Sequence, residues 1–348
     1  MLRWIFVLLP FWLVSLPASH PLSTTNNPEL KRFHFSENKM GSPFNLIFYH
    51  KDSLEANSIA KECFSIVDSL NNIFSDYSPV SEVGRLAQQP IVHDYRVSTE
   101  LYNMIWKSKM AWIASGGAFD ITIGALTQLW RKAKSENRFP SMEEIKAARR
   151  LTGFKKLGYD VHVKTISFNK SGMCFDFGGI VKGYAAQKII DYLKSKGVTI
   201  ALADAGGDIA LSNAPPGKKG WSISINLPEQ AEEFWDNRLE LSNCAVATSG
   251  DLYNFILHNG KKYSHIIDPR TGYGITSQRN VTVIAKDGAT ADWLATACSI
   301  LSIKQSLALA KKEYAAVFIA TLQNEKVRIY KTENFDAYFE KNQTVELP

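Results

Sequence analysis

The chain has 348 residues, of which 45% are hydrophobic and 21% charged, and its formal net charge is +6 at pH 7. This length allows one large or two ordinary domains, and the composition is ordinary for a globular protein with a sizeable core. The basic residues are spread along the chain and form no basic run interleaved with aromatic residues, which argues against a nucleic-acid partner.

The first 19 residues, MLRWIFVLLPFWLVSLPAS, have the pattern of a secretory signal peptide. Arg3 precedes an apolar run that Pro10 interrupts and that ends in Pro17-Ala18-Ser19. A short membrane anchor is the alternative interpretation, but the run is short for a spanning helix of ~20 residues. No cysteine stands at its end, so we expect no lipid anchor. The pattern predicts an exported protein on the periplasmic or cell-envelope side of the cytoplasmic membrane, peripheral to that membrane at most.

Apolar periodicity and turn residues predict the elements that follow. Ser98 and Ser141 are the expected N-caps of two of the helices. The expected elements are a strand at 44–50, helices at 53–75 and 98–115, a glycine turn and apolar segment at 116–130, a helix at 141–150, a hairpin at 164–178 with its turn at Asn169–Gly172, a helix at 180–196, a strand that runs into a glycine turn at 198–211, strands at 221–226 and 243–249, turn residues that lead into an apolar helix at 286–302, and a closing strand pair at 314–322 and 326–331.

Strands and helices alternate without a regular βαβ period, so we expect the α+β class. The expected organisation is a signal peptide at 1–19, a flexible lead-in at 20–37, one domain at 38–335 and a C-terminal tail at 336–348. The cysteines are far apart and form no metal-binding pair, and all lie in apolar surroundings: Cys63, Cys174, Cys244 and Cys298. An exported chain could pair them in three ways, but buried free thiols are the favoured interpretation.

The densest polar segment is DFGGIVKGY, from Asp176 to Tyr184. Gly178 and Gly179 stand at the entrance to an expected helix, and Lys182 follows three residues later. Free N–H groups at a helix N-terminus suit a phosphate, and a lysine can add charge. An ordinary strand–helix turn with a surface lysine explains the local pattern equally well.

Three further segments carry polar residues where strands or helices are expected to begin or end. DAGGD at 204–208 follows an apolar strand, although in isolation it is better explained as a tight turn. TSGD at 248–251 offers hydroxyls and a carboxylate at a strand end, which alone is a weak signal. Asp292 and Thr296 lie four residues apart and therefore on one helix face. Their oxygen atoms are of the type that Mg²⁺ accepts as ligands, but an exposed Asp and a Thr bonded to its own helix is the simpler local explanation.

YSHIIDPRTG, at residues 263–272, places several polar side chains in a short turn. Proline and glycine in Asp268-Pro269-Arg270-Thr271-Gly272 suit a tight turn. That turn chemistry does not account for His265.

In their order and wording, these segments closely resemble the ApbE family of FAD:protein FMN transferases. Earlier motifs extend the resemblance: Met40-Gly41-Ser42-Pro43-Phe44, FSDYSPVSE at 74–82 and Gly117-Ala118-Phe119-Asp120-Ile121-Thr122. Together they cover about residues 38–330. The resemblance implies mixed sheets with packed helices, related to the T-fold, and a flavin site in a cleft between subdomains.

The resemblance also implies that the enzyme binds FAD and Mg²⁺, moves FMN onto a Thr or Ser hydroxyl of an exported acceptor protein and releases AMP. Typical acceptors are flavoprotein subunits of membrane redox complexes. The implied metal ligands are the carbonyl oxygen of Gly179, where many members have Ala, with Asp292 and Thr296. The implied flavin contacts are Met40, Tyr77, Ala118, Phe119, Asp120, Asp176, Lys182, and His265 or its neighbour Ile267.

Chemistry suggests roles for some of these residues. A cation and Lys182 would stabilise charge that develops on the pyrophosphate. A hydroxyl nucleophile needs a base, and His265 is the best candidate because the histidine pKa near ~6.5 suits proton transfer. Asp268 either orients His265 or only holds the turn.

Two alternatives remain open, and an exported domain with a purely structural role is improbable beside so many motifs. The protein could be an FAD pyrophosphatase that gives FMN and AMP, which product analysis with and without an acceptor would separate. It could also be a non-catalytic exported flavin-binding protein. His265 and the Asp292/Thr296 pair argue against the second, because simple binding requires neither.

Overall fold

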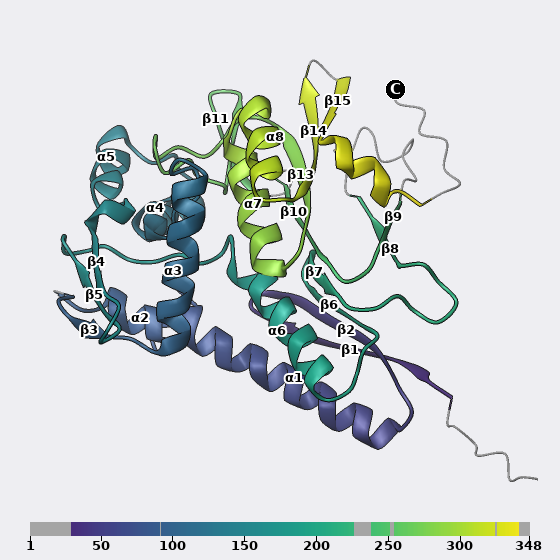
Figure 1. Ribbon diagram of the computed structural model, residues 1–348. Coiled ribbons are helices and arrows are strands. Elements are labelled where there is room, and N and C mark those ends of the chain that lie inside the picture. The colour runs from purple at the N-terminus through teal and green to yellow at the C-terminus, as the bar shows by residue number, and fades with distance from the viewer. Residues whose placement is uncertain (1–28, 91, 226–237, 251–253, 324–325, 341–348) are drawn as a thin grey trace, which may run out of the picture.

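The computed structural model describes residues 29–90, 92–225, 238–250, 254–323 and 326–340, and Figure 1 shows their arrangement. The expected signal peptide lies outside the described residues. Within these ranges no helix combines the length and the apolar character needed to span a membrane.

The described part of the chain is built on an eight-stranded sheet in the order β1-β2-β6-β7-β10-β13-β14-β15. All strand pairs in the described ranges are antiparallel, so the expected α+β class is confirmed, while the sheets are antiparallel rather than mixed. The strands of this sheet are β1 (Lys31–Lys39), β2 (Ser42–His50), β6 (Ala201–Ala205), β7 (Asp208–Leu211), β10 (Ala245–Gly250), β13 (Arg279–Ala285), β14 (Ala316–Gln323) and β15 (Lys326–Lys331).

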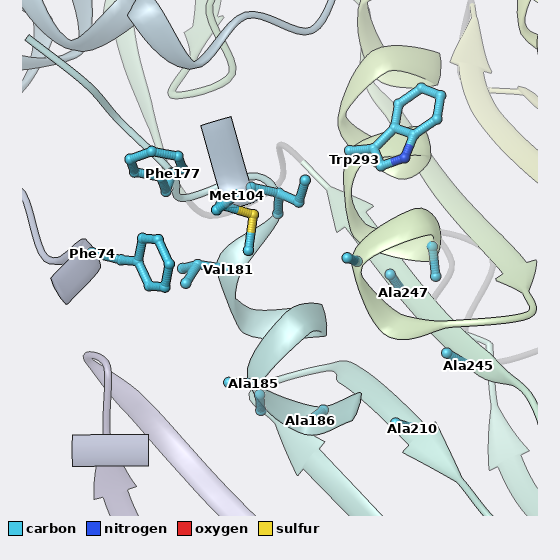
Figure 2. Packing of buried hydrophobic residues seen from close by; sticks show 14 of the residues in the cluster. Phe74, Met104, Phe177, Val181, Ala185, Ala186, Ala210, Ala245, Ala247 and Trp293 are labelled. Atoms are coloured by element: carbon cyan, nitrogen blue, oxygen red, sulfur yellow. The ribbon is translucent and has the colours of Figure 1, made fainter. Parts of the chain in front are cut away.

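Helices α6 (Val181–Ser195) and α7 (Gly288–Ile300) pack against each other and against the middle of this sheet. Small side chains allow this close packing, and Figure 2 shows Ala185 and Ala186 of α6 near Ala245 and Ala247 of β10. Almost every residue of α7 is buried, which fits a helix that is apolar around most of its circumference. The long helix α1 (Ser53–Phe74) packs on α6, and its last residue, Phe74, contacts Phe177 edge to face at 5.2 Å.

A second group of elements lies to one side of the sheet, on the left in Figure 1. It contains α2 (Glu82–Ala87), α3 (Thr99–Ala114), the 3-10 turns η1 (Ile121–Ile123) and η2 (Phe154–Lys156), α4 (Gly124–Ser135), α5 (Met142–Arg150), and a small sheet of β3 (Tyr95–Arg96), β5 (Thr165–Phe168) and β4 (Leu157–Asp160). The remaining elements are the pair β8 (Trp221–Ser224) and β9 (Arg238–Leu241), the hairpin β11 (Phe255–His258) and β12 (Lys261–Ser264), α8 (Ile303–Lys312) and the 3-10 helix η4 (Glu333–Tyr338).

The predicted helix caps are confirmed. Ser98 accepts a hydrogen bond from the Leu101 amide at 3.2 Å, and Ser141 and Glu144 form a reciprocal capping box. Helix α8 was not predicted, although Ser302 and Gln305 form the same signature before it. All four cysteines are free thiols, as favoured from the sequence.

One predicted element and two predicted domain boundaries are wrong. The hairpin at 164–178 does not form, because β5 pairs with β3 and β4, while residues 173–175 and Phe177 of the expected second strand are buried without strand pairing. Residues 31–37, expected in the lead-in, belong to β1, where Phe33 and Phe35 pack against Phe48. The start of the expected tail is packed into the core through η4 and Phe339, which is only 9% exposed.

The segment at 198–211, expected as a strand that runs into a glycine turn, forms the strands β6 and β7 on the two sides of that turn. Gly206 and Gly207 turn the chain between them with φ angles of +69° and +101°, which glycine adopts without strain. This turn places Asp208 at the start of β7, at the edge of a cavity.

Candidate active site

A cavity of about 860 Å³ lies between the end of α1, the loops before and after η1, the start of α6, the β11–β12 hairpin and α7. Its volume is within the range of about 300–1,000 Å³ that is usual for sites of small molecules and cofactors. Of the site residues predicted from the sequence, only Asp268 does not line it. The others do: Met40, Tyr77, Ala118, Phe119, Asp120, Asp176, Gly179, Lys182, His265, Ile267, Asp292 and Thr296.

Two glycines bring α6 and α7 together next to the lining residues Lys182 and Asp292. A Cβ on Gly183 would lie 2.1 Å from the carbonyl oxygen of Gly288, and a Cβ on Gly288 would lie 2.0 Å from that of Gly183. No larger residue fits at either position without moving a backbone. The contact places Asp292 at the first turn of α6, where its Oδ2 accepts a hydrogen bond from the Gly183 amide at 3.0 Å.

Asp292 and Asp208 form a pair that we call the acidic pair. Burial raises the pKa of Asp292 to about 7, against the opposing effects of the α6 amides and Lys182. The pKa of Asp208 is raised well above its usual range, first by burial and then by the negative charge of Asp292, with Lys182 opposing this shift. The acidic pair is therefore only partly neutralised by the side chains around it.

Gly179 and Thr296 meet beside the acidic pair. A Cβ on Gly179 would lie 2.7 Å from Oγ1 of Thr296, so the turn before α6 touches the face of α7 that carries Asp292. The three ligands implied for Mg²⁺ thus line one part of the cavity. Among the described residues no group of three or more His, Cys, Asp or Glu side chains could hold a metal ion. The donors would be carboxylate, hydroxyl and carbonyl oxygens, and an under-neutralised acidic pair with such neighbours fits a hard cation.

The cavity is also lined by a cluster that we call the arginine clamp, made of Asp76, Arg131 and Asp176. Nη2 of Arg131 donates to Oδ2 of Asp76 and, at 2.9 Å, to Oδ2 of Asp176. The guanidinium carbon also lies 4.2 Å from the ring centre of Tyr77. Burial raises the pKa of Asp76 to about 6, and Asp176 adds to this effect while Arg131 opposes it. Sequence reasoning missed Arg131, because a single arginine on an amphipathic helix carries no signal of its tertiary contacts.

Asp120 is a further acidic residue that lines the cavity. Its Oδ1 accepts hydrogen bonds from the amide of Thr122 at 2.8 Å and from its hydroxyl at 2.6 Å, and burial raises its pKa. The adjacent Phe119 is buried and packs against Trp293 of α7 with ring centres 6.2 Å apart. Met40 reaches the cavity from the β1–β2 turn, in a left-handed conformation with φ of 51°.

His265 is exposed on the cavity side of the turn after β12. Its Nδ1 lies 3.2 Å from the carbonyl oxygen of Asn254, and its amide donates to the same oxygen at 2.9 Å. Desolvation by the surrounding protein lowers the pKa of His265, and the charges of Lys134 and Lys182 act in the same direction, against the hydrogen bond to Asn254.

Asp268 does not orient His265. Its carboxylate accepts hydrogen bonds from the Arg270 side chain at 2.9 and 2.8 Å and from the Arg270 amide at 2.9 Å, and no hydrogen bond joins it to His265 within the described residues. Its carbonyl oxygen accepts from the Gly272 amide at 2.8 Å. Of the two roles considered for Asp268, holding the turn is the one that the geometry supports, and a catalytic role is not.

The strand end at 248–250 also reaches the cavity, through Thr248, Ser249 and Gly250. Oγ1 of Thr248 lies 3.1 Å from Oγ1 of Thr282 on the neighbouring strand. Asp251, the last residue of that sequence motif, lies outside the described residues.

The chain matches the model of the ApbE family over residues 40–319. It is 28% identical to an FAD:protein FMN transferase of Vibrio cholerae, over 95% of this chain and 99% of that protein. It is 30% identical to one of Chlamydia muridarum, over 74% of this chain and 81% of the relative.

Solved structures agree with these sequence matches. The flavin transferase ApbE from Vibrio cholerae superposes with a TM-score of 0.80 at 27% identity, covering 89% of this chain and 100% of that one. The apo flavinyl transferase ApbE of Pseudomonas stutzeri superposes with a TM-score of 0.79 at 29% identity, covering 89% of this chain and 97% of that one. The matched model spans most of the chain and contains every predicted site residue, and we conclude that this protein belongs to the ApbE family.

Proposed function

We propose that this enzyme transfers the FMN moiety of FAD to a Ser or Thr hydroxyl of an acceptor protein and releases AMP, with Mg²⁺ as its cofactor. The relatives named FAD:protein FMN transferase support the reaction class. One observation carries the proposal for this chain. The acidic pair, Lys182 and His265 line the same cavity as Tyr77 and the arginine clamp, so one ligand with a diphosphate and a flat ring could contact all of them.

The residues at the start of α6 would hold the diphosphate. The carbonyl oxygen of Gly179, Asp292 and Thr296 would hold Mg²⁺, which when bound supplies positive charge to the diphosphate oxygens. Lys182, in the first turn of α6, would bind the same oxygens through its ammonium group. Binding here would position the phosphorus atom for attack by the acceptor.

His265 would take the proton of the acceptor hydroxyl. When Nδ1 donates to the Asn254 carbonyl oxygen, Nε2 is left with a free lone pair that can accept this proton. The lowered pKa keeps the ring neutral at pH 7. The acceptor oxygen then forms a bond to the FMN phosphorus, the bond from that phosphorus to the bridging oxygen breaks, and AMP leaves with the bonding electron pair.

The acceptor and the location follow from the sequence pattern and the family resemblance. The signal-like segment at 1–19 favours work outside the cytoplasmic membrane. We therefore propose an exported acceptor, such as a flavoprotein subunit of a membrane redox complex.

The test is to incubate the mature protein with FAD, Mg²⁺ and an exported acceptor and to weigh the intact acceptor by mass spectrometry. The proposal predicts a mass gain of one FMN, with one AMP formed per FMN transferred. His265→Ala should lower the rate by about 100-fold or more, while FAD affinity stays within a few-fold of wild type.

Other outcomes would separate the alternatives. FAD split to FMN and AMP without an acceptor mass gain would indicate a pyrophosphatase. FAD binding without AMP formation under any condition would indicate a binding protein. Near-normal transfer by His265→Ala would remove the base assignment while leaving the transferase reaction intact.

A further inference from the structure

Arg131 connects three segments that are distant in sequence. It lies on α4, while Asp76 and Tyr77 follow the end of α1 and Asp176 precedes α6. Oδ1 of Asp176 also accepts a hydrogen bond from the Gly178 amide at 2.7 Å, which fixes the start of the glycine turn. One guanidinium thus contacts both the loop that carries Tyr77 and the segment that leads to the cation-binding part of the cavity.

Tyr77 is unusual among the aromatic residues of the cavity because 76% of its surface is exposed. An exposed tyrosine on a loop would ordinarily sample several rotamers. Here the guanidinium of Arg131 lies against one face of the ring, with its central carbon 4.2 Å from the ring centre. This is cation–π geometry, and it leaves the other face of the ring available to a ligand.

Several hydrogen bonds hold the guanidinium of Arg131 in place against Tyr77. The hydrogen bonds that Arg131 makes with described residues all go through Nη2, to Asp76, Asp176 and the hydroxyl of Thr127. Asp76 is adjacent to Tyr77, so the same arginine holds the main chain of the loop and the ring that projects from it. The cluster therefore holds one guanidinium hydrogen-bonded to two carboxylates.

We propose that Arg131 is a positioning residue that fixes Tyr77 as a platform for the isoalloxazine ring of FAD. The inference rests on the proposed function, because it takes FAD as the ligand. It predicts that Arg131 contributes to affinity for the flavin part of FAD and contributes nothing to affinity for its ADP part. An arginine that recognised the diphosphate instead would affect both ligands alike.

The experiment compares FAD and ADP as probes, each titrated by calorimetry into the mature protein in the presence of Mg²⁺. Arg131→Met should weaken FAD binding about tenfold, in line with loss of a contact of roughly 1–2 kcal/mol, and should leave ADP binding within twofold. Quenching of flavin fluorescence on binding should decrease. Arg131→Lys keeps the charge and should recover part of the affinity. Lys132→Met, on an exposed position of the same helix, is the matched control and should change neither ligand.

A double-mutant cycle separates positioning from a general structural role. Tyr77→Leu should weaken FAD binding about as much as Arg131→Met, and the two changes together should weaken it little more than either alone. Additive losses, or an equal loss of ADP affinity in Arg131→Met, would overturn the proposal. If Arg131→Met does not fold, Arg131→Met/Asp76→Asn removes one of the two unpaired charges, restores the net charge of the cluster and carries the same expectations.

The FAD and ADP binding measurements do not depend on whether the protein transfers FMN. Wild-type protein that binds FAD and modifies no acceptor would count against the proposed function only. The FAD and ADP affinities of the variants would still decide the role of Arg131.

Discussion

The cavity has two acidic regions that are built from the same residue type and balanced in different ways. In the arginine clamp, Asp76 and Asp176 share the guanidinium of Arg131. In the acidic pair, Asp208 and Asp292 have only the partial compensation of Lys182 and the α6 amides, and burial raises the pKa of both. In the first region the guanidinium is hydrogen-bonded directly to both carboxylates, whereas in the second the Lys182 side chain acts on the carboxylates through its charge.

This difference indicates a division of labour along the cavity. A region whose charges are satisfied internally is rigid and suits the binding of an uncharged ring. A region with unsatisfied buried carboxylates binds an external cation and can respond when charge develops during phosphoryl transfer. Changes to single residues, to pH or to Mg²⁺ can remove this contrast or make it measurable.

The largest effect is expected from Asp292→Asn, which removes one charge of the acidic pair and keeps an oxygen that can accept from the Gly183 amide. FMN transfer should fall by about 1,000-fold or more, because the cation and its charge on the diphosphate are lost. The measurement is the acceptor mass gain over a range of Mg²⁺ concentrations. Mg²⁺-dependent transfer near the wild-type rate would show that Asp292 is not a ligand.

The second-largest effect is expected from Arg131→Met, which removes the internal cation of the arginine clamp and lowers the stability of the protein. Asp76 and Asp176 would be left without a counter-charge, and loss of a partly buried partner should destabilise the protein by about 1–3 kcal/mol, or roughly 5 °C in melting temperature for a chain of this size. Thermal unfolding at pH 8 and pH 5 tests this. The loss should shrink below about pH 6, where Asp76 takes up a proton. An equal loss at both pH values would contradict the electrostatic explanation.

A smaller effect is expected on the pH dependence of the metal-free wild-type protein. The pKa of Asp292 is about 7 in the folded protein, above the ordinary aspartate value, so the folded state holds a proton that the unfolded state has released. The contribution of Asp292 to the free energy of unfolding should therefore decrease as the pH rises from about 4 to about 7 and stay low above it.

Mg²⁺ should reverse this trend. Binding to the ionised carboxylate should raise the melting temperature by a few degrees at pH 8 and by less at pH 5.5. Calorimetric scans with and without Mg²⁺ measure both effects, and Asp292→Asn is the control that should show neither. Equal stabilisation of that variant by Mg²⁺ would place the cation elsewhere.

Much of the scaffold could be predicted from the sequence because its signals are local. The apolar stripe of α1, the serine caps of α3 and α5 and the apolar character of α7 are all contained within single segments. The expected hairpin at 164–178 failed for the opposite reason. Its second half alternates like a strand, but its burial comes from tertiary packing, with the Asp176 amide donating to Ile121 at 2.8 Å and the Cys174 carbonyl lying against Gly124.

The same difference between local and tertiary signals applies to the residues of the candidate site. Residues within the family motifs were found because the motifs could be matched in order, and the cavity brings nearly all of them together. Arg131 could not be found, because its importance depends on two carboxylates 55 and 45 residues away in the chain. Asp268 was given a catalytic role because it is close in sequence to His265, whereas its carboxylate is bound by Arg270.

The smallest effect is expected from Gly179→Ala, which tests the geometry of the cation-binding part of the cavity without changing its charge. The new Cβ would lie 2.7 Å from Oγ1 and 3.2 Å from Cγ2 of Thr296, so the threonine side chain must move by some tenths of an ångström. Mg²⁺ affinity should fall about threefold to tenfold, a change of roughly 1 kcal/mol, while the rate at saturating Mg²⁺ changes little because Asp292 and Lys182 are untouched. Titration of transfer activity with Mg²⁺ measures this shift, and Gly158→Ala, on β4 and away from the cavity, is the control. If Gly179→Ala left the Mg²⁺ requirement unchanged, the close contact between the α6 turn and α7 would not set the geometry of the cation site.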